Sequence, residues 1–353
     1  MNQIFADRFR SARVLNGLSL QDLADKLNNR ISRQALHKYE KGDVVPDSEM
    51  VSLLSEVLGV KPDFFFRETN IVMSDIEFRK LKNLPAKDEQ RIIEEVKDTL
   101  SRYLELEEIL SIQTMFVNPL KGKILSINSF SDVENAVKIV REAWNLGIDP
   151  ISNALELLED YHIKIIEVNA GESFDGMQTW VNGNIPVIAI NTDKVISSDR
   201  KRFTALHELA HLLLPINHLP EKKKETYCHQ FAGAFLLPAE TAYKELGKGR
   251  SKLMIQELSI LKKQYGISIQ AIVMRAKDLE IITNSYCSQF FFYLNQMGWK
   301  VNEPVEYIGE ETSNRFTQLL FRALGEELIS TSKAASLNNQ SLAEFREKSL
   351  LVA

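Results

Sequence analysis

Residues 202–214 read Arg202-Phe203-Thr204-Ala205-Leu206-His207-Glu208-Leu209-Ala210-His211-Leu212-Leu213-Leu214. Apolar side chains recur here at helical spacing, so the segment is expected to form a largely buried α-helix. His207 and His211 are four residues apart. They therefore lie on one face of that helix, about 6 Å from each other. The segment predicts a helix that directs two imidazoles, and the neighbouring Glu208, towards one site.

This spacing is typical of a catalytic zinc helix. Two histidines so placed can bind one metal ion, and the Glu between them can reach a water at the metal without binding the ion itself. The metal lowers the pKa of the water and polarises a peptide carbonyl, while Glu208 takes the proton and later passes it to the leaving amine. A buried cluster of two His and one Glu would be costly without a metal. We therefore expect Zn²⁺ at His207 and His211, with Glu208 as the catalytic base.

A second helical segment, residues 225–238, supplies the candidate for a third ligand. Glu225 and His229 are again four residues apart on one helix face. The loop between the two helices is long enough to return the chain antiparallel. We expect Glu225 to be the third zinc ligand, and His229 to be either an alternative ligand or a group that holds a ligating carboxylate. Cys228 is expected to face elsewhere and to act as a small buried apolar residue.

The sequence before the zinc helix predicts a small sheet. Asn182-Gly183-Asn184 is expected to join two strands as a hairpin turn. A strand beside the zinc helix can hold an extended peptide by backbone hydrogen bonds, and residues 187–190 are the candidate. The alternative is a core strand without a free edge. The expected helices span 131–146 and 151–162, and the expected strands span 163–168, 177–181 and 186–191.

The N-terminal part, residues 4–66, predicts five short helices. Ser19 begins a capping box with Asp22 at the start of the second helix, and Ser32 is expected to cap the third. A turn at Asn28-Asn29-Arg30 separates this pair, which is the arrangement of a helix-turn-helix DNA reader. The expected helices span 4–15, 20–27, 33–40, a segment capped by Ser48, and a last turn at 62–66.

Arg and Gln side chains match the guanine and adenine edges in the major groove, and the third helix offers both on its exposed side. The alternative is an all-helical protein-binding domain, because residues 1–66 hold nine Lys/Arg and nine Asp/Glu and are therefore neutral. Non-specific attraction to phosphates should then be weak. The residues expected to contact DNA are Gln21, Ser32, Arg33, Gln34, His37 and Lys38.

Between these two parts, residues 74–85 predict a short helix and residues 87–112 a long one. The apolar residues of the long helix alternate in steps of three and four, which suits either a coiled-coil seam between two protomers or a face packed on its own chain. The seam would let a homodimer span two half-sites of a double-stranded DNA operator. The C-terminal residues 281–353 are expected to be helical, with no assigned role.

Composition excludes several classes of protein. Two cysteines in 353 residues cannot build a disulfide framework, and the N-terminus has no signal peptide, so a cytoplasmic protein is expected. No run approaches 18 apolar residues, so we expect no membrane span. A net charge of −5 excludes a globally basic nucleic-acid binder but leaves room for a local DNA-reading surface.

Two family resemblances rest on these motifs. The pattern LxDLAxKL…SRQALHKYEKG resembles the Cro/CI-type (Xre) helix-turn-helix family, although the turn at residues 28–31 is about two residues longer than usual. The sequence RFTALHELAHLLL followed by ExxCHxFAxxFLLP resembles the ImmA/IrrE metallopeptidases over roughly residues 120–280. This second resemblance implies zinc ligation by His207, His211 and Glu225, with Glu208 as general base. Members of that family are cytosolic proteases that cut helix-turn-helix repressors and so release phage, mobile-element or DNA-damage genes.

Together these features predict a mostly α protein with a small β-sheet, of the α+β class. We expect a regulator that binds DNA and carries a zinc endopeptidase, which cleaves a helix-turn-helix repressor or another copy of itself to control phage, mobile-element or stress-response genes. The alternative is a repressor or antitoxin whose zinc domain is a non-catalytic sensor or binds a partner. The expected domains are a helix-turn-helix domain at 1–68, a helical connector at 74–116, a zincin-like metallopeptidase domain at 120–280 and a helical region at 281–353.

Overall fold

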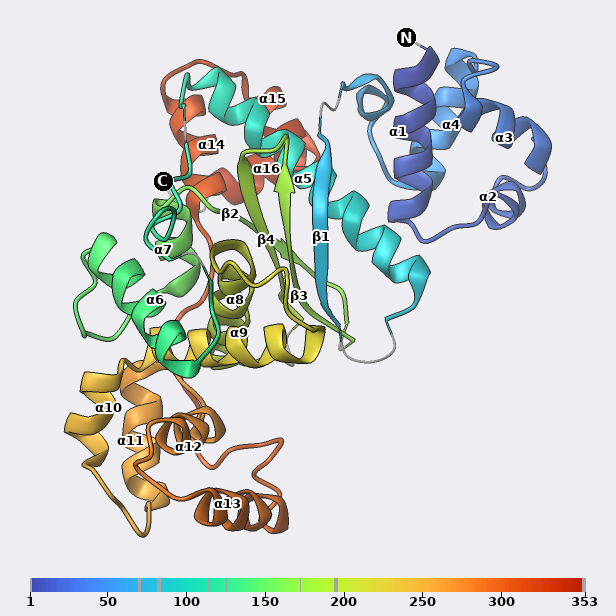
Figure 1. Ribbon diagram of the computed structural model, residues 1–353. Helices are drawn as coiled ribbons and strands as arrows, with labels where there is room; N and C mark the ends of the chain where they lie inside the picture. Colours follow the sequence, from blue (N-terminus) through green and yellow to red (C-terminus); the bar gives the residue numbers. More distant parts are fainter. Residues whose placement is uncertain are drawn as a thin grey trace. The chain divides into compact units, whose positions relative to one another are not determined.

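The computed structural model of the chain describes residues 2–68, 71–80, 84–113, 115–124, 126–171, 173–193 and 196–350 (Figure 1). Helices predominate, and the strands of the described residues form one four-stranded sheet, so the predicted α+β class is confirmed. Residue contacts divide the chain into two compact units. The first consists of Met1–Val72, Leu81–Ile112 and Leu320–Ala353, and the second of Met73–Lys80 and Gln113–Leu319. The domain boundaries given above stay a prediction.

The first unit begins with the expected run of short helices. Ser19 and Asp22 form the predicted capping box, and the Ser32 side chain accepts a hydrogen bond from the Ala35 backbone, so both caps are confirmed. The fourth cap is wrong by one residue, because Asp47 rather than Ser48 accepts from the Met50 backbone. The elements are α1 (Asn2–Leu15), α2 (Leu20–Lys26), α3 (Arg33–Lys41), α4 (Ser48–Leu58) and the 3-10 helix η1 (Pro62–Phe66).

The long helix α5 (Ala86–Ile109) packs on its own chain within the first unit. Asp98 on α5 pairs with Arg8 of α1 at 2.7 Å and with Arg102 at 3.2 Å. Arg102 also donates to the backbone oxygen of Leu337 at 2.7 Å. The apolar seam of α5 is buried within the single chain, which agrees with the second of the two interpretations of its spacing. Its fully buried residues are Val96, Leu100, Tyr103 and Leu106.

The helix predicted at 74–85 is wrong. Residues 73–80 form strand β1 (Met73–Lys80), which pairs antiparallel with β3 (Phe174–Val181) and belongs to the second unit. The pairing partner lies about 100 residues further along the chain, so a local pattern of side chains could not identify it. Residues 81–83 lie outside the described residues.

The sheet of the second unit has the order β1-β3-β4-β2, with β2 at Lys164–Val168 and β4 at Ile185–Asn191. Strands β3 and β4 form the predicted hairpin, whose turn residues Asn182 and Gly183 have φ values of 50° and 76°. Strand β4 pairs with β3 on one side and runs parallel to β2 on the other. Residues 187–190 therefore have no free edge, and their prediction as a peptide-binding strand is wrong.

Helices α8 and α9 lie side by side, and α8 packs against β3 and β4 (Figure 1). Their large common core includes Leu206, Leu209 and Phe231, which are fully buried. None of the helices in the described ranges is long and apolar enough to cross a membrane. The helices that follow β1 and α5 are α6 (Phe130–Ala143), α7 (Ala154–Asp160), α8 (Ser198–Leu213), α9 (Glu221–Leu236), α10 (Ala239–Leu246), α11 (Ile255–Tyr265), α12 (Ile269–Asp278), α13 (Asn284–Gln296), α14 (Arg315–Gly325), α15 (Thr331–Leu337) and α16 (Leu342–Leu350).

Candidate metal centre and DNA-facing helix

Helix α8 is fixed in the second unit by a buried charge as well as by its apolar face. Arg202, which is 0% exposed, lies 3.2 Å from the Glu311 carboxylate and donates to the Ile151 backbone and the Tyr307 hydroxyl. Burial outweighs the attraction of Arg202 and raises the pKa of Glu311 to about 7. The anchored residue lies five positions before His207, so these contacts hold the start of the helix that carries the histidines.

The structure brings His207, His211 and Glu225 together. The two imidazole Nε2 atoms are 3.2 Å apart. The Glu225 carboxylate lies 3.3 Å from Nε2 of His207 and 3.2 Å from Nε2 of His211. Two helices thus direct three donor atoms to one point, with His207 fully buried and Glu225 more exposed.

The three donor atoms fit a zinc ion. Tetrahedral ligand atoms about 2.0–2.2 Å from zinc are about 3.3–3.6 Å from one another, close to the separations found here. A neutral imidazole carries one N–H, so two Nε2 atoms can face each other only when they share a proton or a cation. Hydrogen bonds with His207 and His211 hold the pKa of Glu225 well below its usual range, which keeps it a carboxylate, the form that binds metal.

Glu208, the expected base, is 1% exposed and follows His207 on α8. Gly176 of strand β3 lies directly against it: a Cβ placed on Gly176 would be 3.5 Å from Cγ of Glu208. The glycine therefore lets the helix approach the sheet closely at the position of the predicted base.

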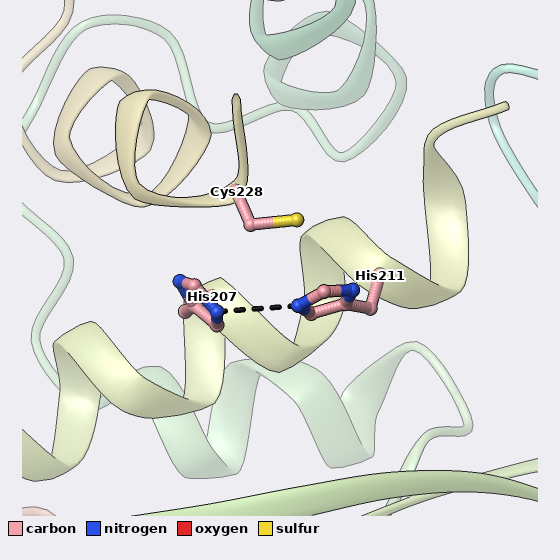
Figure 2. A group of neighbouring side chains, drawn as sticks. All are labelled: His207, His211 and Cys228. Atoms are coloured by element: carbon pink, nitrogen blue, oxygen red, sulfur yellow. Dashed lines mark hydrogen bonds between the residues drawn. The ribbon is translucent and has the colours of Figure 1, made fainter. Parts of the chain in front are cut away.

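The prediction for Cys228 is confirmed in its burial and wrong in its direction. This residue is fully buried as expected, but it does not face elsewhere. Its sulfur and ring nitrogens of His207 and His211 all lie within 4.8 Å of one another, and Figure 2 shows the side chain directed towards the histidine pair. Burial raises the pKa of the thiol to about 11. The signal was available in the sequence, because Cys228 follows Glu225 by three residues and such residues share a helix face.

His229 is exposed at the rim of the same cluster. Its Nδ1 lies 2.6 Å from the backbone oxygen of Glu225, and because that carbonyl can only accept, Nδ1 is the donor of this hydrogen bond. The rings of His229 and His207 have centroids 4.4 Å apart, and ligand atoms of His207, Glu225 and His229 lie within 4.8 Å of one another. Both predicted roles of His229 remain open.

In the first unit, helix α3 presents its predicted contact residues to solvent. Leu36 is fully buried beneath them, and Tyr39 makes edge contacts with Phe5 and Phe9 of α1. Asn28 and Asn29 form the preceding turn with positive φ values of 53° and 55°. The exposed residues are Ser32, Arg33, Gln34, His37 and Lys38 on and before α3, together with Gln21 on α2.

Comparison with known proteins agrees with these two parts. Residues 9–65 match the helix-turn-helix family, and residues 158–277 match the IrrE N-terminal-like domain of the M78 peptidase family. A curated relative is the SPbeta prophage-derived uncharacterized HTH-type transcriptional regulator YonR of Bacillus subtilis (strain 168), with 39% identity over 67 residues. That match spans 19% of this chain and 60% of the relative. The two predicted resemblances are confirmed.

Proposed function

Because this chain carries an Xre-type helix-turn-helix domain and an IrrE-like peptidase-family domain, we propose that it is a DNA-binding transcriptional regulator with a zinc-dependent endopeptidase site. The observation that carries the proposal is the convergence of His207, His211 and Glu225, with separations of 3.2–3.3 Å between their donor atoms. Glu208 follows His207 directly in the sequence of helix α8. Such a regulator acts in the cytoplasm, where its operator lies.

In this proposal His207 and His211 hold the zinc ion through Nε2, and Glu225 holds it through its carboxylate. The zinc, when bound, polarises the scissile carbonyl and makes the attacking water more acidic. Glu208 takes the proton from that water on a carboxylate oxygen and passes it to the departing amine. His207 and Glu208 are both nearly excluded from solvent, which strengthens electrostatic interactions between them and a bound substrate.

The proposed substrate is a helix-turn-helix repressor, either a separate protein or another copy of this chain. Its cleavage would release phage, mobile-element or stress-response genes. This part of the proposal rests on the IrrE-like match of residues 158–277 and on the presence of a DNA-reading domain in the same chain.

For DNA, we propose that α3 enters the major groove of a double-stranded operator, with Arg33 and Gln34 at base edges and Lys38 at the backbone. All three side chains are exposed. A homodimer would place two such helices on a palindrome. Because the seam of α5 is buried within one chain, the dimer must form through another surface.

A second function is favoured by one observation, the position of Cys228 beside the histidine pair. Four protein ligands are typical of structural zinc sites, whereas catalytic sites keep one position open for water. If the thiol stayed on the metal permanently as fourth ligand, the domain would be a sensor, and the chain would be a repressor or antitoxin without peptidase activity.

The deciding experiment incubates full-length, zinc-loaded protein with helix-turn-helix repressors encoded by neighbouring genes and identifies fragments by mass spectrometry. We expect a discrete cleavage product from the wild type and from Glu240→Gln, a control at an exposed glutamate of α10. Glu208→Gln should bind zinc and give no product, since it lacks the base. Intact repressor in every reaction would reject the peptidase and support the sensor.

A further inference from the structure

Cys228 extends from α9 towards the two histidines of α8, as Figure 2 shows. The thiol belongs to the same helix face as Glu225, one helical turn further on. Three ligand atoms, from Cys228, His207 and His211, lie within 4.8 Å of one another, and the cysteine is fully buried. A fourth potential metal donor therefore lies beside the three that the sequence indicates.

The distances are compatible with one ion. Zinc binds sulfur at about 2.3 Å and imidazole nitrogen at about 2.0–2.1 Å, which places sulfur and nitrogen about 3.6 Å apart in a tetrahedron. The sulfur and the two ring nitrogens lie within 4.8 Å of one another, so each separation is at most about 1.2 Å longer than this value. Rotation about the Cα–Cβ bond moves the sulfur over distances of this size without a change of the backbone.

The chemistry of the thiol also favours zinc binding by Cys228. Thiolate is a soft donor that zinc prefers, and a coordinating thiol is deprotonated by the metal itself. Solvent does not reach Cys228, so water does not compete with the sulfur from that side.

We propose that Cys228 is a fourth zinc ligand that closes the metal centre in the resting protein. This inference rests on the zinc site of the proposed function. His207, His211, Glu225 and Cys228 would then be the four protein ligands of the ion, and a position for the water needed for peptide hydrolysis would be open only when the thiolate is not bound. The second metal-binding helix thus limits peptidase activity through this thiolate, and each departure of the side chain opens the site for cleavage.

Cobalt substitution tests this directly, because Co²⁺ bound to thiolate gives a near-ultraviolet charge-transfer band that nitrogen and oxygen ligands do not give. The full-length protein is loaded with Co²⁺ as wild type, Cys228→Ser, Cys228→Ala and Cys287→Ser. Cys287 is the other buried free cysteine and serves as the matched control. We expect the band in the wild type and in Cys287→Ser, and its loss in both Cys228 variants.

Metal affinity gives an independent readout. Competition with a chromophoric chelator should show that Cys228→Ala binds Zn²⁺ at least tenfold more weakly than Cys287→Ser. Stoichiometric Co²⁺ binding to the wild type without the band would overturn this inference and leave the zinc site intact. Failure of the wild type to bind Co²⁺ or Zn²⁺ at all would overturn both this inference and the proposed function. Cys228→Ser and Cys228→Ala differ in polarity, so a folding defect in one variant does not decide the result.

Discussion

Gly176 of strand β3 lies against Glu208 of helix α8 across the sheet–helix interface, where a side chain on the strand would collide with Thr204 of the same helix. A Cβ on Gly176 would lie 2.8 Å from Cγ2 of Thr204, 3.1 Å from the backbone oxygen of Ala189 and 3.5 Å from Cγ of Glu208. Contacts below 3.0 Å require a neighbour to move. The position of the predicted base therefore depends on the absence of a side chain on the strand.

Gly176→Ala should push α8 away from the sheet and displace Glu208. We expect a loss of about 1–3 kcal/mol in the free energy of unfolding, the usual cost of overpacking, and a lower rate of repressor cleavage. Urea denaturation and the cleavage assay measure the two effects. Gly325→Ala in α14 is the control, because a Cβ there meets nothing within 4 Å. Equal free energies of unfolding for Gly176→Ala and Gly325→Ala would show that the interface accommodates the added methyl group without a loss of stability.

Removal of the metal should destabilise the second unit. A ligand at 100 times its dissociation constant adds about 2.7 kcal/mol to the stability of the folded state. We therefore expect a chelator to lower the midpoint of thermal unfolding of the wild type and of His218→Ala, an exposed histidine outside the site. His207→Ala should unfold at a lower temperature with or without chelator. A wild-type midpoint that does not respond to zinc or chelator would contradict a metal centre at these residues.

Gln34→Ala should weaken binding to the cognate operator by about 1–3 kcal/mol, or roughly 5- to 150-fold, if the side chain reads a base edge. The site is first selected from random sequences with the full-length protein, and affinities are then measured by fluorescence anisotropy. Gln318→Ala removes an exposed glutamine of α14 and should bind as the wild type. Because residues 1–66 are neutral, affinity should fall only gradually with salt. If Gln34→Ala and Gln318→Ala bind equally, α3 does not read bases through this residue.

The raised pKa of Glu311 predicts a pH-dependent stability. The folded protein keeps this proton up to about pH 7, whereas the unfolded chain releases it near pH 4.3. In that window the folded state binds more protons, so the free energy of unfolding decreases as pH rises, by up to about 3 kcal/mol. Urea denaturation at pH 5 and pH 8 should show this decrease in the wild type and in the control Glu310→Gln. The difference in the free energy of unfolding between pH 5 and pH 8 should be smaller in Glu311→Gln. If it is unchanged, the pH dependence arises from other groups.

Local signals predicted the local structure well. Ser19, Asp22 and Ser32 were sufficient to place two helix starts, because a cap is decided within four residues. The histidine helix and the hairpin at Asn182-Gly183 were likewise visible, since their periodicity and turn residues are contained in short segments.

Features that depend on distant partners could not be predicted in the same way. Strand β1 exists through its pairing with β3, including the hydrogen bond from Thr179 to the backbone oxygen of Ser74. The seam of α5 fits two partners equally well by spacing, and only the fold shows that its own chain covers it. Cys228 is a different case, because the spacing of three residues already places it on the helix face of Glu225. The direction of its side chain was predicted wrongly because cysteine was treated as a small apolar residue.

Strand β1 also limits how this protein can be cut for biochemical work. A truncation that starts at residue 113 keeps the metal-binding helices but removes β1, so the backbone N–H and C=O groups of β3 become an open sheet edge. Open edges of this kind promote aggregation, and the irregular register of β1 against β3 is a feature that protects natural edges. A peptidase fragment should therefore precipitate unless residues 73–80 are supplied, for example as a circular permutant that fuses them to its end.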